Sequence, residues 1–337
     1  MPTSPTTLAL LSQAVADAQK ILIVPHNDPD PDAIASALAL RHLFQQRMGI
    51  EGTIVYRGMI GRAENKALVR YLGHPLRCLD DSDLECGMPF ALVDTQPGAG
   101  NHPLPPNCPV TIVIDHHPHR ASTLPAQFMD VRPELGATST ILAEYLQAAE
   151  VTLPPTLATA LFYGIKADTM GLGRGASPAD TAAYLYLHPR IDFEALGEIE
   201  RAQVPADYFR NFAAALRAAR IYDGVLVSYI GVMGYPDLAA EVADLLLRLQ
   251  GVVWVICMGV HREELIIAVR TRNRQGGAGH LVRQIVAERG TAGGHGAMAG
   301  GQIPLGDTNP RQLARILRQR ALQTLQIPAD TPSQRLI

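Results

Sequence analysis

Short apolar runs alternate with helical patterns in the first half of this chain, and this alternation constrains the fold more than any other feature. The runs are apolar throughout and rich in β-branched residues, which is typical of strands buried on both faces of a parallel sheet. Strands are expected at 21–24, 53–56, 90–93 and 110–114. Helices are expected at 32–48, 62–72, 138–149 and 157–166. The sequence therefore predicts a doubly wound α/β domain.

The pattern changes near Pro189, and a chain of 337 residues is long enough for two domains. Residues 205–221 predict a long linking helix that begins at a proline, which the first turn of a helix accepts. Beyond it we expect strands at 225–229, 252–258 and 265–270, helices at 238–249 and 279–288, and a glycine-rich segment at 290–301. The expected organisation is a first domain over 1–190, a helical linker over 191–222 and a smaller α/β domain over 223–327.

Composition and charge exclude several classes of protein. The net charge is −3, with 29 basic and 32 acidic side chains, whereas proteins that hold long duplex nucleic acid usually carry a basic excess. No signal-peptide pattern opens the chain, and the most apolar stretch, 251–260, is about half of a membrane span. The four cysteines form no C-x-x-C pair and are expected to be buried in a reducing compartment. We expect a cytoplasmic protein with no membrane partner, for which a homodimer is one option of assembly.

The sharpest chemical signal is the segment HNDPDPD at 26–32, directly after the first expected strand. Ligand sites of open α/β sheets form at the carboxyl ends of strands. Three carboxylates, Asp28, Asp30 and Asp32, lie within five residues and repel one another unless a positive group lies among them. A divalent cation is the simplest such group. For Asp32 alone, capping the following helix is an equal alternative.

Other expected element ends carry the same residue types. Asp94 follows the strand at 90–93, Asp115, His116 and His117 follow the strand at 110–114, and Asp168 follows an apolar segment. A single Asp after a strand is common, because Asp forms turns. Several such ends that mix Asp with His favour one shared metal site.

The ligand types narrow the choice of metal. Carboxylate and imidazole without thiolate suit Mn²⁺, with Mg²⁺ and Co²⁺ as alternatives, better than a structural zinc site. The ligands outnumber the needs of one ion, and two ions roughly 3.5–4 Å apart, bridged by a carboxylate, would use them all. A water between such ions becomes hydroxide near neutral pH and can attack phosphorus. The pattern predicts a hydrolase of phosphate esters.

These motifs resemble the four motifs of the DHH phosphoesterase superfamily, and GGH at 293–295 resembles the glycine-rich signature of its DHHA1 domain. The resemblance runs from about His26 to Gly301 and is nearest to stand-alone nano-RNase and pAp-phosphatase enzymes. It implies a DHH catalytic domain, a DHHA1 substrate-binding domain and an active site in the cleft between them. Family II pyrophosphatases share the first motifs but have a different second domain.

The resemblance also implies a role for each position. It implies metal ligands in two groups that share one carboxylate: His26, Asp30 and Asp94 for one ion, and Asp32, Asp94, His116 and Asp168 for the other. His117 would contact the scissile phosphate, and Asp115 would orient the imidazoles, as carboxylates do for metal-bound histidines. Pro31 departs from the Gly that is frequent in the family, and Asp28 from the frequent Asn.

Two further segments are candidates for substrate binding. Thr138 and Ser139 begin a helix, where free N–H groups bind anions, although a plain N-cap explains them equally well. In the second domain, Arg270 and Thr271 end a strand, where an exposed arginine alone is weak evidence. The segment Gly293, Gly294 and His295 is stronger, because glycines let a backbone approach a ligand closely. The family resemblance implies that Arg270 and His295 hold the distal part of the substrate.

The expected substrate is therefore a small nucleotide or short single-stranded RNA, such as nanoRNA or pAp. A phosphodiesterase of cyclic or linear dinucleotides is an alternative that the motifs do not separate. A catalytically silent nucleotide sensor would lack a ligand, and none is missing. A dinucleotide-cofactor binder would carry G-x-G-x-x-G where this chain has HNDPDPD.

Overall fold

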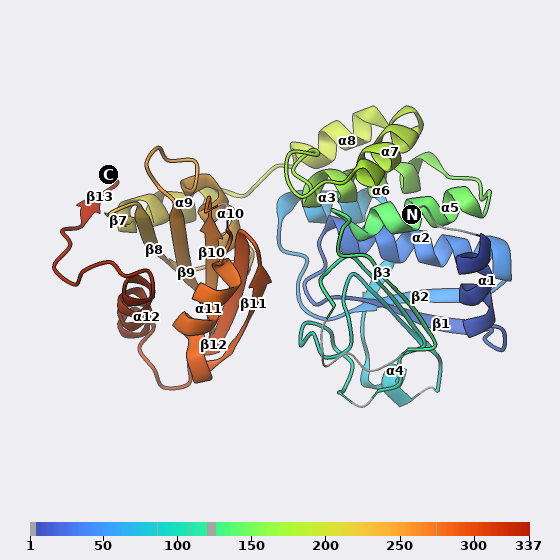
Figure 1. The fold of residues 1–337 in the computed structure, drawn as a ribbon, viewed down its shortest axis with the longest axis horizontal. Helices are drawn as coiled ribbons and strands as arrows, with labels where there is room; N and C mark the ends of the chain where they lie inside the picture. The colour runs from blue at the N-terminus through green and yellow to red at the C-terminus, as the bar shows by residue number, and fades with distance from the viewer. Residues whose placement is uncertain (1–4, 86, 107, 120–125, 274) are drawn as a thin grey trace. The chain divides into compact units, whose positions relative to one another are not determined.

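The computed structural model describes residues 5–85, 87–106, 108–119, 126–273 and 275–337. The chain divides into two compact units, Met1–Ala202 and Gln203–Ile337 (Figure 1). The division lies before the segment in which a linking helix is expected. That helix is α9 (Ala206–Ala218), which packs against β8 of the second unit. Each unit has its own buried core.

The first unit contains a six-stranded sheet in the order β3-β2-β1-β4-β5-β6, with every pair parallel. Its strands are β1 (Lys20–Pro25), β2 (Glu51–Tyr56), β3 (Leu76–Cys78), β4 (Phe90–Val93), β5 (Ile112–Asp115) and β6 (Phe128–Val131). The predicted parallel α/β sheet is confirmed. The sequence pattern misses the two edge strands, β3 and β6, because they are short and partly exposed.

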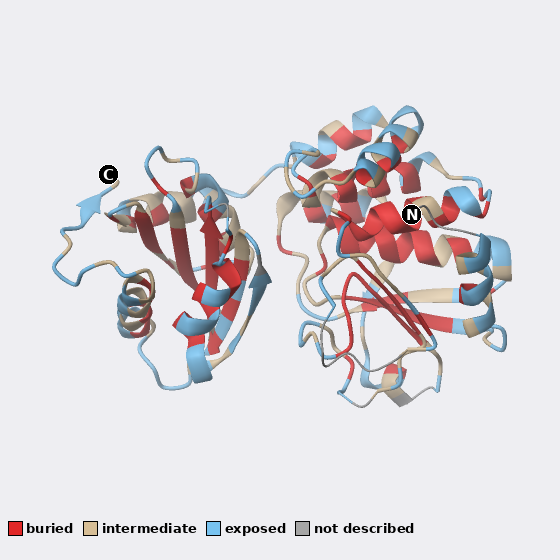
Figure 2. Ribbon diagram, in the orientation of Figure 1, coloured by how far each residue is buried: buried red, intermediate tan, exposed pale blue. Residues whose placement is uncertain are grey.

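Helices cover one face of this sheet, and they are α1 (Pro5–Ala14), α2 (Pro31–Met48), α3 (Ala63–Tyr71), α5 (Thr138–Ala148), α6 (Pro155–Asp168), α7 (Pro178–Leu187) and α8 (Phe193–Glu200), with a short 3₁₀ turn at His188–Arg190. The core on this face joins alternate strand residues such as Ile23 and Val93 to the buried sides of α2, α5 and α6. The opposite residues, such as Leu22 and Leu92, pack against loops and against the neighbourhood of α4 (Asp81–Glu85). Figure 2 shows the buried residues gathered in the central strands and in α2.

Helix α2 begins directly after the HNDPDPD segment. Asp30, rather than Asp32, is its N-cap: the Asp30 Oδ1 accepts from Ala33 N at 3.0 Å. Pro31 takes the first helical position, where a proline loses no hydrogen bond. The fixed φ of a proline suits this position.

The strand order reverses between β1 and β4. Chain segments leaving neighbouring strands at such a point diverge, which leaves a crevice beyond the carboxyl ends of the strands. Strands β1, β4 and β5 all end at this edge of the sheet, and the segments that follow them begin there. This edge is where the predicted metal ligands are placed by the topology.

The second unit contains a mixed seven-stranded sheet in the order β11-β12-β10-β9-β8-β7-β13, in which β8 and β9 are parallel. Its strands are β7 (Arg220–Tyr222), β8 (Val225–Val232), β9 (Trp254–His261), β10 (Glu264–Thr271), β11 (Thr291–His295), β12 (Met298–Pro304) and β13 (Gln334–Arg335). Besides α9, its helices are α10 (Leu238–Leu246), α11 (Ala278–Val286) and α12 (Pro310–Thr324), with a 3₁₀ turn at Ala287–Arg289. The glycine-rich segment forms the hairpin β11–β12.

The expectation that the cysteines are buried holds for only one of the three that the structure describes. Cys257 is buried as expected, but Cys78, which ends the edge strand β3, is exposed, and Cys108, in the loop before β5, is half-buried. Cys86 lies outside the described residues. Among the helices that the structure describes, none combines the length and apolar character that crossing a bilayer requires.

Candidate metal centre

The predicted ligands gather at the carboxyl edge of the first sheet. They form two groups, in each of which one ligand atom per residue lies within 4.8 Å of the others, and a third such group joins Asp94 and His116 to His117. One group is His26, Asp30 and Asp94, and the other is Asp32, His116 and Asp168. Five of the six residues lie at a strand end or at the start of α2, and the sixth, Asp168, is the last residue of α6. The topology thus brings together side chains that are up to 142 positions apart (168 − 26).

Asp94 lies between the two groups. Its Oδ2 is 3.5 Å from His26 Nε2, and its Oδ1 is 3.5 Å from His116 Nε2. Each oxygen therefore faces a different group, as a bridging carboxylate requires. The backbone of Asp94 has a φ of +59°, an uncommon region for a residue with a side chain. A hydrogen bond from Asp94 N to Ile114 O, 2.9 Å long, holds this conformation in place.

Backbone carbonyls orient the two histidines of these groups. His26 Nδ1 lies 2.7 Å from Asn27 O, and His116 Nδ1 lies 3.2 Å from Leu135 O. A carbonyl only accepts, so each Nδ1 carries a proton and each Nε2 is the ring nitrogen that faces the carboxylates. The Nε2 of His116 is buried and has no hydrogen-bond partner in the described part of the chain, although Asp168 Oδ2 is 3.3 Å away. A buried imidazole nitrogen without a hydrogen-bond partner among carboxylates fits a bound cation, which would displace any proton there.

The N-terminus of α5 binds an anion, and that anion is the side chain of Asp32. Thr138 N donates to Asp32 Oδ2 and Ser139 N donates to Asp32 Oδ1, both at 2.7 Å. Thr138 Oγ1 donates to Asp94 Oδ1 at 2.8 Å. Thr138 and Ser139 are fully buried. The expectation that these two residues contact substrate does not fit this arrangement, because their amides are engaged by a carboxylate of the centre itself.

Charge in the centre is strongly unbalanced. Burial, together with the charge of Asp168, raises the pKa of Asp32 to about 7. Burial and the charge of Asp32 also raise the pKa of Asp94 well above the ordinary carboxylate range. Burial opposes the protonation of His26, but the hydrogen bond and charge of Asp30 and the charge of Asp94 outweigh it and raise its pKa to about 10. The cluster retains protons to offset its negative charge, and divalent cations would replace them.

Asp115 orients His117 rather than His116. Its Oδ1 accepts from His117 N at 3.2 Å and lies 2.8 Å from His117 Nδ1, while its Oδ2 accepts from Gln96 Nε2 at 2.8 Å. Burial opposes ionisation of Asp115, but its hydrogen bonds with His117 and Gln96 lower its pKa to about 2. Gln96 is a residue that the sequence analysis missed. It is buried and also donates to the carbonyls of His117 and Pro118, and its only sequence signal is its place two residues after Asp94.

Asp28 takes no part in either group of ligands. Its Oδ1 accepts from Met59 N at 2.6 Å, and its φ is +54°. The extra carboxylate in HNDPDPD therefore ties the loop after β1 to the loop after β2.

The candidate substrate residues of the second unit lie in β10 and β11. Arg270 is 8 % exposed and donates from Nε to Asp244 Oδ1 at 2.6 Å. Thr271 Oγ1 donates to Val253 O at 3.1 Å. A side chain at Gly293 would meet open space, whereas one at Gly294, where φ is +131°, would collide with the backbone of β12. The side chain of His295 lies outside the described part of the structure.

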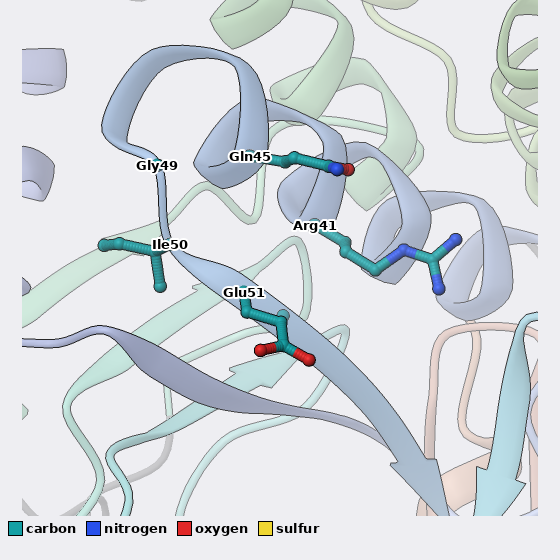
Figure 3. A pocket seen from close by; sticks show the side chains of 6 residues that line it. Arg41, Gln45, Gly49, Ile50 and Glu51 are labelled. Carbon is teal, nitrogen blue, oxygen red and sulfur yellow. The ribbon is translucent and has the colours of Figure 1, made fainter.

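A separate surface cavity of about 360 Å³ lies where α2 ends and β2 begins (Figure 3). It is lined by Arg41, Gln45, Gly49, Ile50, Glu51 and Gly52. Helix α2 has 18 residues and is about 27 Å long at 1.5 Å per residue. Its first turn carries Asp32 and its C-terminal end borders this cavity, so the cavity is not part of the metal centre.

Comparison with known proteins gives one family match. Residues 20–165 match the model described as the DHH family, N-terminal domain. The chain is 37 % identical over 288 residues to the uncharacterized protein MJ1633 of Methanocaldococcus jannaschii. The aligned region covers 85 % of this chain and 58 % of that protein. It is 28 % identical over 310 residues to the cyclic-di-AMP phosphodiesterase GdpP of Geobacillus thermodenitrificans. The aligned region covers 87 % of this chain and 46 % of that protein. The chain thus spans about half the length of these relatives.

A solved structure has a similar fold along nearly the whole chain. It is an exopolyphosphatase-related protein from Bacteroides fragilis, with a TM-score of 0.76, 15 % identity, and coverage of 95 % of this chain and 96 % of that one. At this level of identity the likeness concerns the fold.

Proposed function

We propose that this chain, whose residues 20–165 match the DHH family model, is a metal-dependent phosphoesterase of that family. The proposed reaction is hydrolysis of phosphodiester or phosphomonoester bonds in short oligonucleotides or small nucleotides. The observation that carries this proposal is the pair of carboxylate–imidazole groups on either side of Asp94. The oxygen and nitrogen donors suit two divalent cations, with Mn²⁺ as the expected ion.

The proposed ligands follow the two groups. His26, Asp30 and Asp94 would hold one ion, and Asp32, Asp94, His116 and Asp168 would hold the other. Bound divalent cations would lower the pKa of a water molecule and neutralise phosphate oxygens. The protein's part is to hold the ligands: Thr138 keeps Asp94 in place, and the amides of α5 keep Asp32 in place.

We assign His117 the contact with the scissile phosphate and the donation of a proton to the leaving oxygen. Its side chain is 37 % exposed, against 16 % for His26 and 11 % for His116, so it is the most accessible of the three. Its Nδ1 is bonded to Asp115, so in the proposed role Nε2 is the atom that contacts the substrate. Asp115 and Gln96 then serve to hold the imidazole at a fixed angle.

Short substrates are favoured by the net charge of −3, since a long nucleic acid needs many basic contacts. Within the second unit, we propose that Arg270, Thr271, Gly293, Gly294 and His295 hold the part of the substrate away from the cleaved bond. The similarity to GdpP supports cyclic or linear dinucleotides as a second class of substrate. The presence of all six predicted ligands argues against a sensor without turnover. A cytoplasmic location is proposed with this function.

A hydrolysis panel tests the proposal. The full chain is assayed with Mn²⁺ and with a chelator against pAp, a linear dinucleotide, a five-residue RNA, cyclic di-AMP, a long duplex and pyrophosphate. We expect Mn²⁺-dependent release of mononucleotide or phosphate from at least one small nucleotide. No turnover of any of these compounds in Mn²⁺, Mg²⁺ or Co²⁺ would refute the enzymatic assignment.

A matched pair of variants tests the role of Asp94. Asp94→Asn keeps the shape of the side chain but removes the shared charge, and it should abolish turnover in a folded protein. Asp28→Asn makes the same change in the loop before α2 and keeps an oxygen for Met59 N. It should retain activity close to that of the wild type. Equal activity of the two variants would exclude the bridging role.

A further inference from the structure

Asp180, on α7, is a buried carboxylate outside the ligand groups described above. It is 0 % exposed. Its Oδ2 accepts from Gly136 N at 2.9 Å and from Ser177 N and Oγ, both at 2.7 Å, and its Oδ1 accepts from Thr140 Oγ1 at 2.5 Å. No lysine, arginine or histidine of the described residues lies within ion-pair distance of it. A carboxylate buried without a cation is costly, so its hydrogen bonds must serve a structural purpose.

Capping explains only part of this arrangement. Ser177 and Asp180 form a capping box at the start of α7, and a capping box requires no contact outside its own helix. The bonds from Gly136 and Thr140 come from a different part of the chain, more than 35 residues earlier. These two bonds are therefore the feature that needs another explanation.

The two outside partners flank the segment that holds a metal ligand. Thr138 and Ser139 lie between Gly136 and Thr140, and their amides donate to Asp32. The carboxylate of Asp180 thus fixes both sides of the segment that fixes Asp32. Oriented amides of this kind keep a carboxylate in a single rotamer, which leaves its remaining lone pairs directed at an ion.

The same contact reaches the end of α6. A Cβ at Gly136 would lie 2.6 Å from Thr169 Cγ2 and 3.2 Å from Asp180 Oδ2, so these groups pack tightly around the glycine. Thr169 directly follows the ligand Asp168. Asp180 therefore lies where the segment that holds Asp32 meets the residue after Asp168.

We propose that Asp180 is a positioning residue for the group Asp32, His116 and Asp168, and that it sets the affinity of that group for its ion. The ion held by His26, Asp30 and Asp94 should be affected less, because Asp180 reaches that group only through the hydrogen bond from Thr138 Oγ1 to Asp94. This inference rests on the proposed metal-dependent function. It makes a specific claim that this function does not: a carboxylate that touches no ligand controls the affinity of one ion of the pair more than that of the other.

The test is a calorimetric titration of the full chain with Mn²⁺. The wild type should bind two ions. Asp180→Asn places an amide against donors that need an acceptor. It should lower the affinity for one of the two ions by about tenfold to a hundredfold, the usual effect of losing an outer partner of a ligand. Ser177→Ala is the matched control, because it disturbs the cap of α7 and leaves the Gly136 and Thr140 bonds intact. Both of its affinities should equal those of the wild type.

A double-variant series assigns the weakened ion. Added to Asp168→Asn, the Asp180→Asn change should cause no further loss, because both act on the same group. When Asp180→Asn is added to Asp30→Asn, it should lower the Mn²⁺ affinity as much as it does in the wild type, because Asp30 belongs to the other group. If circular dichroism shows Asp180→Asn to be unfolded, Thr140→Val replaces it, since that change removes one outside bond and should weaken the same ion to a smaller extent.

The outcomes separate the two proposals. A wild type that binds no Mn²⁺ refutes the metal-dependent function and this inference with it. Two ions in the wild type with unchanged affinities in a folded Asp180→Asn or Thr140→Val variant refute the positioning role alone. Equal weakening of both ions, or the same weakening in Ser177→Ala, would also overturn it, because the effect would then be a general loss of structure.

Discussion

Gly164 lies inside α6, where a glycine ordinarily weakens a helix, and its replacement by alanine gives a quantitative test of the packing around the metal centre. A Cβ at this position would lie 2.5 Å from Ser139 Oγ and 3.1 Å from Asp32 Cα. Rotation of Ser139 would relieve the first contact, but the second is with backbone. The glycine is therefore required for α6 to approach α2 and α5 at the point where Asp32 is held.

Gly197, inside α8 of the same unit, supplies the control, because a Cβ there would meet nothing within 4 Å. Gly197→Ala should stabilise the unit by up to about 1 kcal/mol through helix propensity. Gly164→Ala gains the same term but adds an overpacking cost of about 1–3 kcal/mol. The difference between the two variants should therefore be about 1–3 kcal/mol, with Gly164→Ala the less stable.

The assay is urea unfolding of both variants and the wild type, followed by circular dichroism. Mn²⁺ affinity is measured alongside, and Gly164→Ala should bind Mn²⁺ more weakly because Asp32 is displaced. If the two variants have the same free energy of unfolding and the same Mn²⁺ affinity, the close packing of α6 against Asp32 is not a constraint and the reasoning fails.

Three other changes have defined outcomes. Gln96→Met removes the donor to Asp115 and should lower kcat by about tenfold to a hundredfold at unchanged Mn²⁺ affinity in a titration; a normal kcat would show that Gln96 does not position His117. Mn²⁺ should raise the Tm more at pH 8 than at pH 6 in calorimetry. The reason is that Asp32, with a pKa raised to about 7, binds at pH 6 a proton that competes with the cation. Without a cation, the folded state disfavours the charged form of Asp32, so the stability falls as the pH rises from the ordinary carboxylate range to about 7. A smaller shift of Tm at pH 8 would contradict this sign. Asp28→Ala leaves the N–H of Met59 unpaired and should lower the free energy of unfolding in urea by about 1–3 kcal/mol. An unchanged unfolding midpoint would show that the hydrogen bond between Asp28 and Met59 does not hold the two loops together.

Much of the fold follows from local patterns. The central strands β1, β4 and β5 are continuous apolar runs, so their positions are predicted within two residues. The edge strands β3 and β6 are not, because a strand of three or four partly exposed residues has no distinct pattern. The hairpin β11–β12 was visible only as a glycine-rich segment, since glycine carries little strand propensity.

The sequence by itself determined which residues have the chemistry of metal ligands and that most of them stand near the ends of buried strands, because ligand chemistry and hydrophobic periodicity are properties of a residue and its near neighbours. Only the tertiary structure decided what each of these residues touches. Asp32 receives the amides of α5 from more than 100 positions away, and Asp180 braces that same segment from α7. Gly164 lets these elements meet because it has no side chain. Contacts of this kind depend on how helices pack across long stretches of chain, and no local pattern encodes them.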